Sequence, residues 1–338
     1  MNKKSFGTLS SGEQTTLYTI SSGKVSAEIT DYGATLVRLW APDKEGNLAD
    51  VILGYDDAKG YEEGTTFQGA IVGRNANRIA GASFAIGGVT HTLTPNEGEN
   101  NLHSGPDFFS KRMWTVEEVT DNSIRLYLYS PNGDQGYPGN ARIRVTYTVE
   151  DNGLTITYDC ICDMDTVFNL TNHSYFNLAG HDHPEKAMEQ ELIMPARVYT
   201  VADDKSIPTG EMRSVEGTPM DFRIAKVIGR DHDMDYEALN LQGGYDHNFE
   251  VFCDPCAILC DPASGRTMAV STDRPGIQFY AGNYIVEEKG KNGAIYTKRS
   301  AVCLETQCYP DSVNHPEWVQ PITKAGEKFH SVTRYAFK

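Results

Sequence analysis

The 338-residue sequence contains no apolar run that approaches the ~20 residues needed to cross a bilayer. It also lacks an apolar segment behind its basic start, Met1 to Lys4, so it shows no signal peptide. Basic residues are scarce relative to acidic ones. The chain has 30 Lys and Arg and 46 Asp and Glu, which give a formal net charge of -16. Such an acidic surface repels nucleic acid and anionic membrane surfaces. These features favour a cytoplasmic protein with a neutral small-molecule partner; an export leader removed earlier stays open as an alternative.

Cysteine is infrequent and odd in number, with seven residues in a chain large enough to bury a core without disulfides. Cys253 and Cys256 have a spacing found in zinc sites, but a structural zinc site needs a second pair at ligand spacing, and none follows. Cys160 and Cys162 would share one face of a strand. We therefore interpret the cysteines as buried or half-buried free thiols in a reducing compartment.

Long segments with a 3.6-residue apolar period are also missing, and only residues 56–63 suggest a short helix. Period-2 alternation dominates instead. It runs through residues 124–128 and 143–149, and it resumes at residues 154–160 after the turn Asp151-Asn152-Gly153. Many short strands separated by turn residues predict a β-sandwich or barrel. No repeat or linker interrupts the chain, so we expect one domain over residues 1–338.

Two segments place chemically useful side chains beside apolar ones. If residues 168–176 are extended, Phe168 and Leu170 point one way. The opposite, polar face then carries Asn169, Thr171, His173 and Tyr175. Glu305 lies in a predicted strand at residues 303–307, where partial loss of water would raise its pKa and make it a better base near neutral pH. Taken singly, each residue is more readily explained as a structural histidine or a rim carboxylate.

Two further segments carry groups that suit a sugar. Asp246 precedes an apolar strand, and Gln278 lies between Ile277 and Phe279. Aromatic faces stack on sugar C–H surfaces while polar side chains bind the hydroxyls. The loop at residues 73–78 begins with glycine, but no Gly-Lys-Ser/Thr and no helix follow, which excludes a phosphate-binding loop.

The ordered set of motifs resembles the aldose 1-epimerase family, also called galactose mutarotases. The resemblance runs in order from about residue 25 to the C-terminus. The matching segments are Gly73-Arg-Asn-Ala-Asn-Arg-Ile79, Asn101-Leu-His103, Asn169-Leu-Thr-Asn-His-Ser-Tyr-Phe-Asn-Leu178, Ile207-Pro-Thr-Gly-Glu211, Gly217-Thr-Pro-Met-Asp-Phe222, Asp246-His-Asn-Phe249, Leu304-Glu-Thr-Gln307 and Tyr309-Pro-Asp311.

The resemblance implies an all-β fold, a large antiparallel β-sandwich with an open sugar cleft, without metal or organic cofactor. It implies that Glu305 is the catalytic base and His173 the catalytic acid. A carboxylate with a raised pKa would remove the C1 hydroxyl proton, and a protonated imidazole would protonate the ring oxygen. The substrate-binding residues that it implies are Arg78, His103, Asp246, Asn77 and Gln278.

The sequence departs from the family pattern at two places, neither of which removes a catalytic group. Ser104-Gly105 follows His103 where a Gly-Gly pair is common, and Cys308 stands where His or Asn is usual. These departures leave the preferred aldose open. The spacing of His181 and His183 resembles that of metal ligands, but both follow Ala179-Gly180, so we favour a solvated turn there.

Three other functions compete with the epimerase. A hexose-6-phosphate 1-epimerase would need extra cationic groups, which the acidic sequence does not suggest. A glycosidase using Glu305 and Asp246 would leave His173 and Arg78 without a task. A non-catalytic carbohydrate-binding homologue could lose the acid or the base, yet both are present. The sequence is compatible with a monomer or a homodimer.

Overall fold

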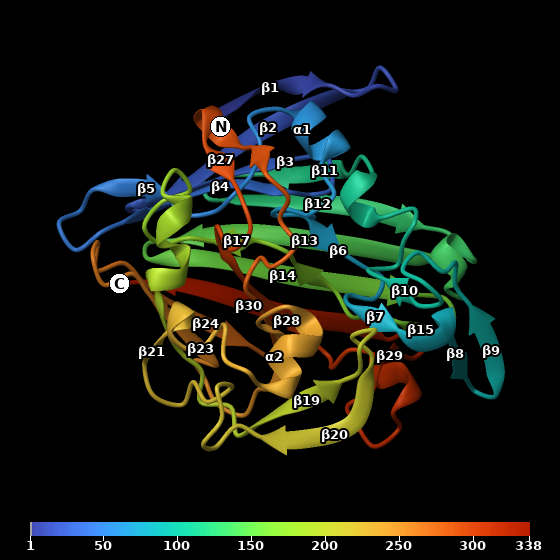
Figure 1. Ribbon diagram of the computed structural model, residues 1–338. Helices are drawn as coiled ribbons and strands as arrows, with labels where there is room; N and C mark the ends of the chain where they lie inside the picture. Colours follow the sequence, from blue (N-terminus) through green and yellow to red (C-terminus); the bar gives the residue numbers. More distant parts are fainter. Residues whose placement is uncertain (1) are drawn as a thin grey trace.

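β-strands are the main regular structure of the chain in the computed structural model, which describes residues 2–338 (Figure 1). Met1, the first residue of the basic start, lies outside the described residues. The strands form large antiparallel sheets and several two-stranded ladders, and the predicted all-β sandwich is confirmed. No helix in residues 2–338 is long and apolar enough to cross a membrane.

A nine-stranded sheet, drawn in Figure 1 as the long green and dark red strands, forms the centre of the described chain. The predicted strands at residues 124–160 are its members β12, β13 and β14, with Ile143 opposite Cys160. Alternate residues such as Val145 and Tyr147 are fully buried. In spatial order its strands are β11 (Thr115–Val119), β12 (Ser123–Ser130), β13 (Ala141–Glu150), β14 (Gly153–Cys162), β30 (Lys328–Phe337), β24 (Thr267–Thr272), β23 (Ala257–Cys260), β18 (Glu191–Ile193) and β21 (Lys226–Val227).

A six-stranded sheet packs on the central sheet near β30. The Phe176 and Tyr335 rings lie 5.0 Å apart, and the Thr306 and Thr333 hydroxyls form a hydrogen bond of 2.5 Å. These contacts join the two sheets across a shared buried cluster. Its strands, in order, are β17 (Tyr175–Phe176), β28 (Val302–Gln307), β25 (Gly276–Tyr280), β22 (Asp246–Glu250), β19 (Val198–Ala202) and β20 (Pro208–Ser214).

A five-stranded N-terminal sheet, blue in Figure 1, covers another part of the central sheet. Ile29 and Leu39 belong to the same buried cluster as Val145, and the Tyr147 hydroxyl donates to the carbonyl of Ala34 at 2.6 Å. Its strands are β1 (Asn2–Thr8), β2 (Gln14–Ser22), β3 (Val25–Thr30), β4 (Leu36–Pro42) and β5 (Leu48–Asp50).

Two-stranded ladders and short helices complete the described chain. The predicted helix is α1 (Ala58–Glu63), capped by Asp57. The helix α2 (Glu237–Gln242) was not predicted, because six residues are too few to show an apolar period. The ladders pair β6 (Ile71–Val72) with β16 (Thr171–Asn172), β7 (Arg78–Ile79) with β10 (Asn101–Leu102), β8 (Ser83–Ile86) with β9 (Val89–Thr92), β15 (Thr166–Val167) with β29 (Ile322–Thr323), and β26 (Glu288–Lys289) with β27 (Ile295–Tyr296). The 3₁₀ turns span Ala80–Ala82, Phe109–Lys111, Asp134–Gly136, Pro184–Glu189, Ile228–Arg230, Lys291–Gly293 and Ser312–Asn314.

The expectation of a solvated turn at His181 and His183 is wrong for His181. Its side chain is buried, and Nδ1 lies 3.0 Å from the Tyr296 hydroxyl. The side chain of His183 is 55% exposed. The turn therefore places the imidazole of His181 in the protein interior and leaves that of His183 in solvent. All seven cysteines are free thiols, five of them buried.

A buried ion pair fastens the loop between β26 and β27 to the N-terminal sheet. Lys291 Nζ donates to Asp50 and to the carbonyls of Val37 and Ile52, at 2.9 and 2.8 Å for the carbonyls. Both charged side chains are at most 1% exposed. Removing one partner of such a pair leaves the other charge buried and unpaired, which is costly.

We expect Lys291→Met to lower the free energy of unfolding by about 3 kcal/mol, because the Asp50 carboxylate loses the cation that bonds to it. Arg38, 3.8 Å from Asp50, remains and limits the loss. Urea unfolding followed by circular dichroism measures the change. The matched control is Lys59→Met, since Lys59 is 70% exposed and pairs with Glu63 on the surface. The control should change stability by at most about 1 kcal/mol. An equal effect of both substitutions would contradict the prediction.

Candidate active site

The strand β28 divides its side chains between the core and a cleft. Leu304 belongs to the core cluster, and Thr306 bonds to Thr333 of β30. Successive side chains of a strand point to opposite faces, so Glu305 points away from the core, between these two. It lines the cleft together with Gln278, its direct cross-strand neighbour on β25.

Glu305 is a buried carboxylate whose Oε2 has no hydrogen-bond partner. Burial raises its pKa well above the usual value, and the nearby charge of Asp246 adds to this, whereas Arg78 lowers it. The sequence predicted a desolvated carboxylate with a raised pKa at this position. A group in this state holds a proton more readily than a surface glutamate does.

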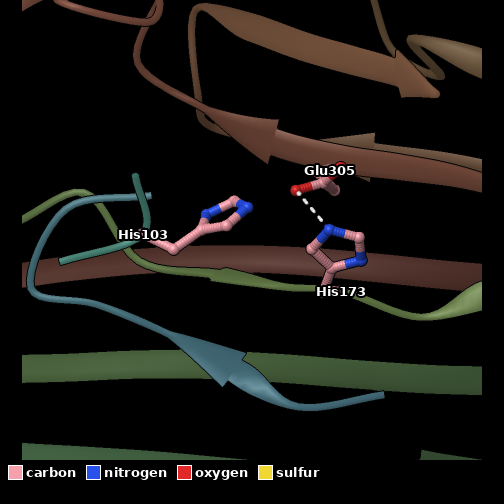
Figure 2. Close-up of side chains that lie close together, drawn as sticks. All are labelled: His103, His173 and Glu305. Carbon is pink, nitrogen blue, oxygen red and sulfur yellow. Dashed lines mark ion pairs between the residues drawn. The ribbon is translucent and has the colours of Figure 1, made fainter. Parts of the chain in front are cut away.

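His173 faces Glu305 across the cleft floor, as Figure 2 shows, with Nε2 3.7 Å from Oε2 of Glu305. Its ring lies between those of Phe67 and Tyr175, at centroid distances of 5.8 and 5.1 Å, and both pairs are stacked. Its Nδ1 lies 3.6 Å from Sγ of Cys303. These contacts fix the imidazole in one orientation.

Burial lowers the pKa of His173 to about 4. The imidazole is therefore neutral near pH 7, which differs from the protonated acid that the family resemblance implies. The reason is that the aromatic rings around it remove water that would stabilise the cation.

The segment at residues 168–176 does not form one continuous strand. It contains β16 and β17, and only His173 and Tyr175 of its polar face line the cleft. Asn169 is buried elsewhere, where its Oδ1 accepts the backbone N–H of Cys308 at 2.8 Å. The predicted polar face is thus divided between the cleft and internal hydrogen bonds.

His103 reaches the cleft from the loop after β10. The backbone N–H of Asn77 donates to its Nδ1 at 3.1 Å, and its own N–H donates to the carbonyl of Asn77 at 3.0 Å. Both residues have a positive φ, 62° for Asn77 and 53° for His103. Burial lowers the pKa of His103 well below its usual value, with His173 and Arg78 adding to this. The neutral ring therefore carries its proton on Nε2.

The trio His103, His173 and Glu305 is the group within residues 2–338 whose ligand atoms come close enough to suggest a metal, all within 4.8 Å of one another. A histidine binds a metal through an unprotonated nitrogen. Nδ1 of His103 accepts from Asn77, and Nε2 carries the ring proton, so neither is free. The trio does not fit a metal site; His103 is a fixed hydrogen-bond donor instead.

Arg78, Asp246 and Gln278 surround the same cleft. Gln278 donates from Nε2 to Oδ1 of Asp246 at 2.6 Å. Arg78 forms a two-bond ion pair with Glu97, of 2.6 Å from Nε and 2.8 Å from Nη2. Burial raises the pKa of Asp246, and the charge of Arg78 opposes the rise. These side chains present charged and neutral donors and acceptors at close range.

The cleft has a volume of about 740 Å³, in the range of small-molecule sites. All seven residues singled out in the sequence line it: Glu305, His173, Arg78, His103, Asp246, Asn77 and Gln278. Other lining residues were not predicted, because they lie in turns without periodic patterns. They include Phe67, Glu97, Glu99, Lys205 and Tyr284. For Phe67 the sequence offered one signal, its position as an aromatic residue in a short loop between Gly64 and Gly69.

A buried carboxylate and imidazole in a polar, aromatic-walled cleft of a β-sandwich define a class of protein: sugar-binding β-sandwich proteins with acid and base groups. The family model "Aldose 1-epimerase" matches residues 16–336. Galactose mutarotase of Mus musculus is 40% identical, with 98% of this chain and 97% of that protein covered. Aldose 1-epimerase of Haemophilus influenzae is 39% identical, with 92% of each covered.

Solved structures agree with these matches. An aldose epimerase homologue from C. elegans has a TM-score of 0.87 at 31% identity, covering 95% of this chain and 98% of that chain. Galactose 1-epimerase from Lactobacillus acidophilus has a TM-score of 0.86 at 26% identity, covering 100% of this chain and 98% of that chain. The chain belongs to the aldose 1-epimerase family.

His247, next to Asp246, gives a test by pH. It is buried beside Tyr199, and burial lowers its pKa to about 4 from 6.5. Between these values the unfolded chain binds a proton that the folded chain does not. Stability is therefore unaffected by this group above pH 6.5 and falls as the pH drops from 6.5 to 4, by up to about 1.4 kcal/mol per pH unit.

We expect His247→Gln to flatten the acid limb of stability against pH in this window, whatever its effect at pH 7. Urea unfolding at intervals between pH 4 and 7 measures the slope. The control is His183→Gln, which changes an exposed histidine and should leave the slope unaltered. An unchanged slope in the His247 variant would show that the folded state protonates this group normally.

Proposed function

We propose that this protein is an aldose 1-epimerase that interconverts the α and β anomers of free aldohexoses such as galactose and glucose, with Glu305 as base and His173 as acid. Membership of the family supports the reaction. The observation that carries the assignment of roles is the carboxylate of Glu305, buried without a partner on Oε2 and 3.7 Å from Nε2 of His173.

A proton bound by Glu305 or by His173 lies close to the other group, since Oε2 and Nε2 are 3.7 Å apart. The pKa of the carboxyl is raised and that of the imidazole lowered, both mainly by burial. The raised pKa of the carboxyl group favours Glu305 as the holder of this proton. Its transfer to His173 gives carboxylate and imidazolium, the pair that the reaction needs. Because the transfer exchanges no proton with solvent, the total charge of the pair stays constant.

The reaction then proceeds with proton balance. Glu305 removes the proton from the C1 hydroxyl while His173 protonates the ring oxygen, and the C1–O5 bond breaks to give the open aldehyde. Rotation about C1–C2 presents the other face of the carbonyl. On closure, the C5 hydroxyl returns its proton to His173, and Glu305 returns its proton to the C1 oxygen. Each group typically contributes about 10²–10⁴ in rate.

The remaining residues hold the sugar so that only its C1 end moves. His103 donates from Nε2, Gln278 orients Asp246, and Arg78 offers its unpaired N–H groups; Asn77 fixes His103 through its backbone. Charge-assisted hydrogen bonds to sugar hydroxyls supply orientation as well as affinity. The stacked rings of Phe67 and Tyr175 preserve the geometry of the acid.

The domain organisation and the location of the protein are proposed from its buried core and its cysteines. One buried cluster draws residues from strands between β2 and β30, which supports a single domain over residues 1–338. The free thiols, five of them buried, support a cytoplasmic location, where cysteines stay reduced.

We expect Glu305→Gln to lower kcat by about 10²–10⁴-fold, because the amide cannot accept the C1 proton. Freshly dissolved α-D-galactose and α-D-glucose are added, and the change of optical rotation is followed. Galactose binding by the variant, measured by calorimetry, should persist. His173→Ala should lose activity over a similar range.

The control for Glu305→Gln is Glu118→Gln, which removes an exposed carboxylate on β11, and it should retain full activity. Near-normal turnover by Glu305→Gln would refute its role as base. Failure of the unaltered protein to accelerate mutarotation of any aldose in a panel would refute the proposed function itself.

We expect Asp246→Ala to act on binding more than on chemistry. Loss of a charged hydrogen bond to a sugar hydroxyl should raise KM for galactose roughly tenfold to hundredfold, with a smaller change in kcat. Steady-state polarimetry separates the two constants. A fall confined to kcat would instead assign Asp246 to the proton transfers.

A further inference from the structure

The cations of the cleft are already paired with carboxylates. Among residues 2–338, the Lys and Arg side chains that line the cleft are Arg78 and Lys205. Both bond to glutamates of the turn that precedes β10, Arg78 to Glu97 and Lys205 to Glu99. His103 and His173 add no positive charge near pH 7, because burial lowers the pKa of each.

The pair of Arg78 and Glu97 is the more enclosed of the two. The Arg78 side chain is 12% exposed and that of Glu97 is 39% exposed. Both carboxylate oxygens of Glu97 accept from the guanidinium. A second carboxylate, Asp246, lies close enough to raise the pKa of Arg78 further. The positive charge of Arg78 is thus offset from two directions.

Lys205 lies at the rim, on the turn between β19 and β20. Its Nζ lies 2.5 Å from Oε1 of Glu99, so the ion pair links this turn to the one before β10. Asp203 and Asp204 also lie near its charge. The side chains of Lys205 and Glu99 are 55% and 65% exposed, so salt and water weaken this pair.

We propose that Glu97 and Glu99 make the cleft selective for uncharged aldoses over sugar phosphates. The proposal rests on the proposed function and extends it to substrate selection. A phosphate monoester carries about -1.5 to -2 charges near pH 7 and is bound by unpaired cations. Whichever outer hydroxyl carries the phosphate, both lining cations already hold a carboxylate, and Asp204 and Asp246 line the same cleft.

Selection of this kind works through repulsion as well as attraction. A free aldose forms hydrogen bonds with the paired groups, since Arg78 keeps N–H groups that Glu97 does not occupy. A sugar phosphate must displace Glu97 or Glu99 from its cation or lie beside uncompensated carboxylates. Either alternative costs affinity for the phosphate and leaves that of the free sugar unaffected.

The test is the double substitution Glu97→Gln/Glu99→Gln, which keeps the shape of both side chains and removes their charge. Galactose 6-phosphate and glucose 6-phosphate are used as inhibitors of galactose mutarotation. The measured quantity is the ratio of Ki for the phosphate to KM for galactose, because it corrects for any displacement of Arg78. We expect this ratio to fall roughly tenfold or more in the double variant, and less at high salt.

The matched control is Glu118→Gln. It removes one negative charge from an exposed position on β11, outside the cleft, and should leave the ratio of Ki to KM as in the unaltered protein. Glu99→Gln alone removes only the exposed ion pair between Lys205 and Glu99. It should lower the ratio of Ki to KM roughly threefold. If circular dichroism shows that the double variant does not fold, this single variant tests the proposal in its place.

Two results would overturn the proposal. One is an unaltered protein that binds galactose 6-phosphate as tightly as galactose. The other is a folded variant whose ratio of Ki to KM is unchanged. If the unaltered protein turns over no aldose, the proposed function fails, but calorimetric titration of galactose and galactose 6-phosphate into the same variants still measures selectivity.

Discussion

The packing of the six-stranded sheet on the central sheet constrains everything at the cleft. Leu304 and Thr306 must face β30, because the two sheets meet there in a dry core. Strand geometry then directs Glu305 to the opposite face, where it is buried without a partner on Oε2. A single cross-strand neighbour, Gln278, sets the next position of the cleft floor. Glu305 is thus placed by core packing rather than by a flexible loop.

Burial of this carboxylate sets the chemistry of its neighbour as well. The surroundings that raise the pKa of Glu305 lower that of His173, because loss of water disfavours the charged form of each. Both pKa shifts therefore follow from a common cause. The unpaired carboxylate also carries a cost in stability, a price that enzymes commonly accept at reacting groups.

The loops around this floor act as an electrostatic filter. The turn that carries Glu97 and Glu99 lies between β9 and β10, and the turn that carries Lys205 joins β19 to β20. They have no regular pattern and contribute little to the core, so their side chains are free to select among ligands. The scaffold therefore holds the reacting groups, while the rim sets which sugars reach them.

The sequence by itself determined the strands β12, β13 and β14 of the central sheet, the strand around Glu305 and seven of the residues that line the cleft. The alternation of apolar residues is a local pattern, and the order of the motifs is a property of the sequence, so both can be recognised without a structure. Only the tertiary structure decided that His173 is neutral, that His181 points inward and that Glu97 occupies Arg78. Each of these depends on water excluded, or a partner supplied, by segments distant in the chain. Local pattern carries no information about such neighbours, so protonation and pairing emerge only when the sheets close around the cleft.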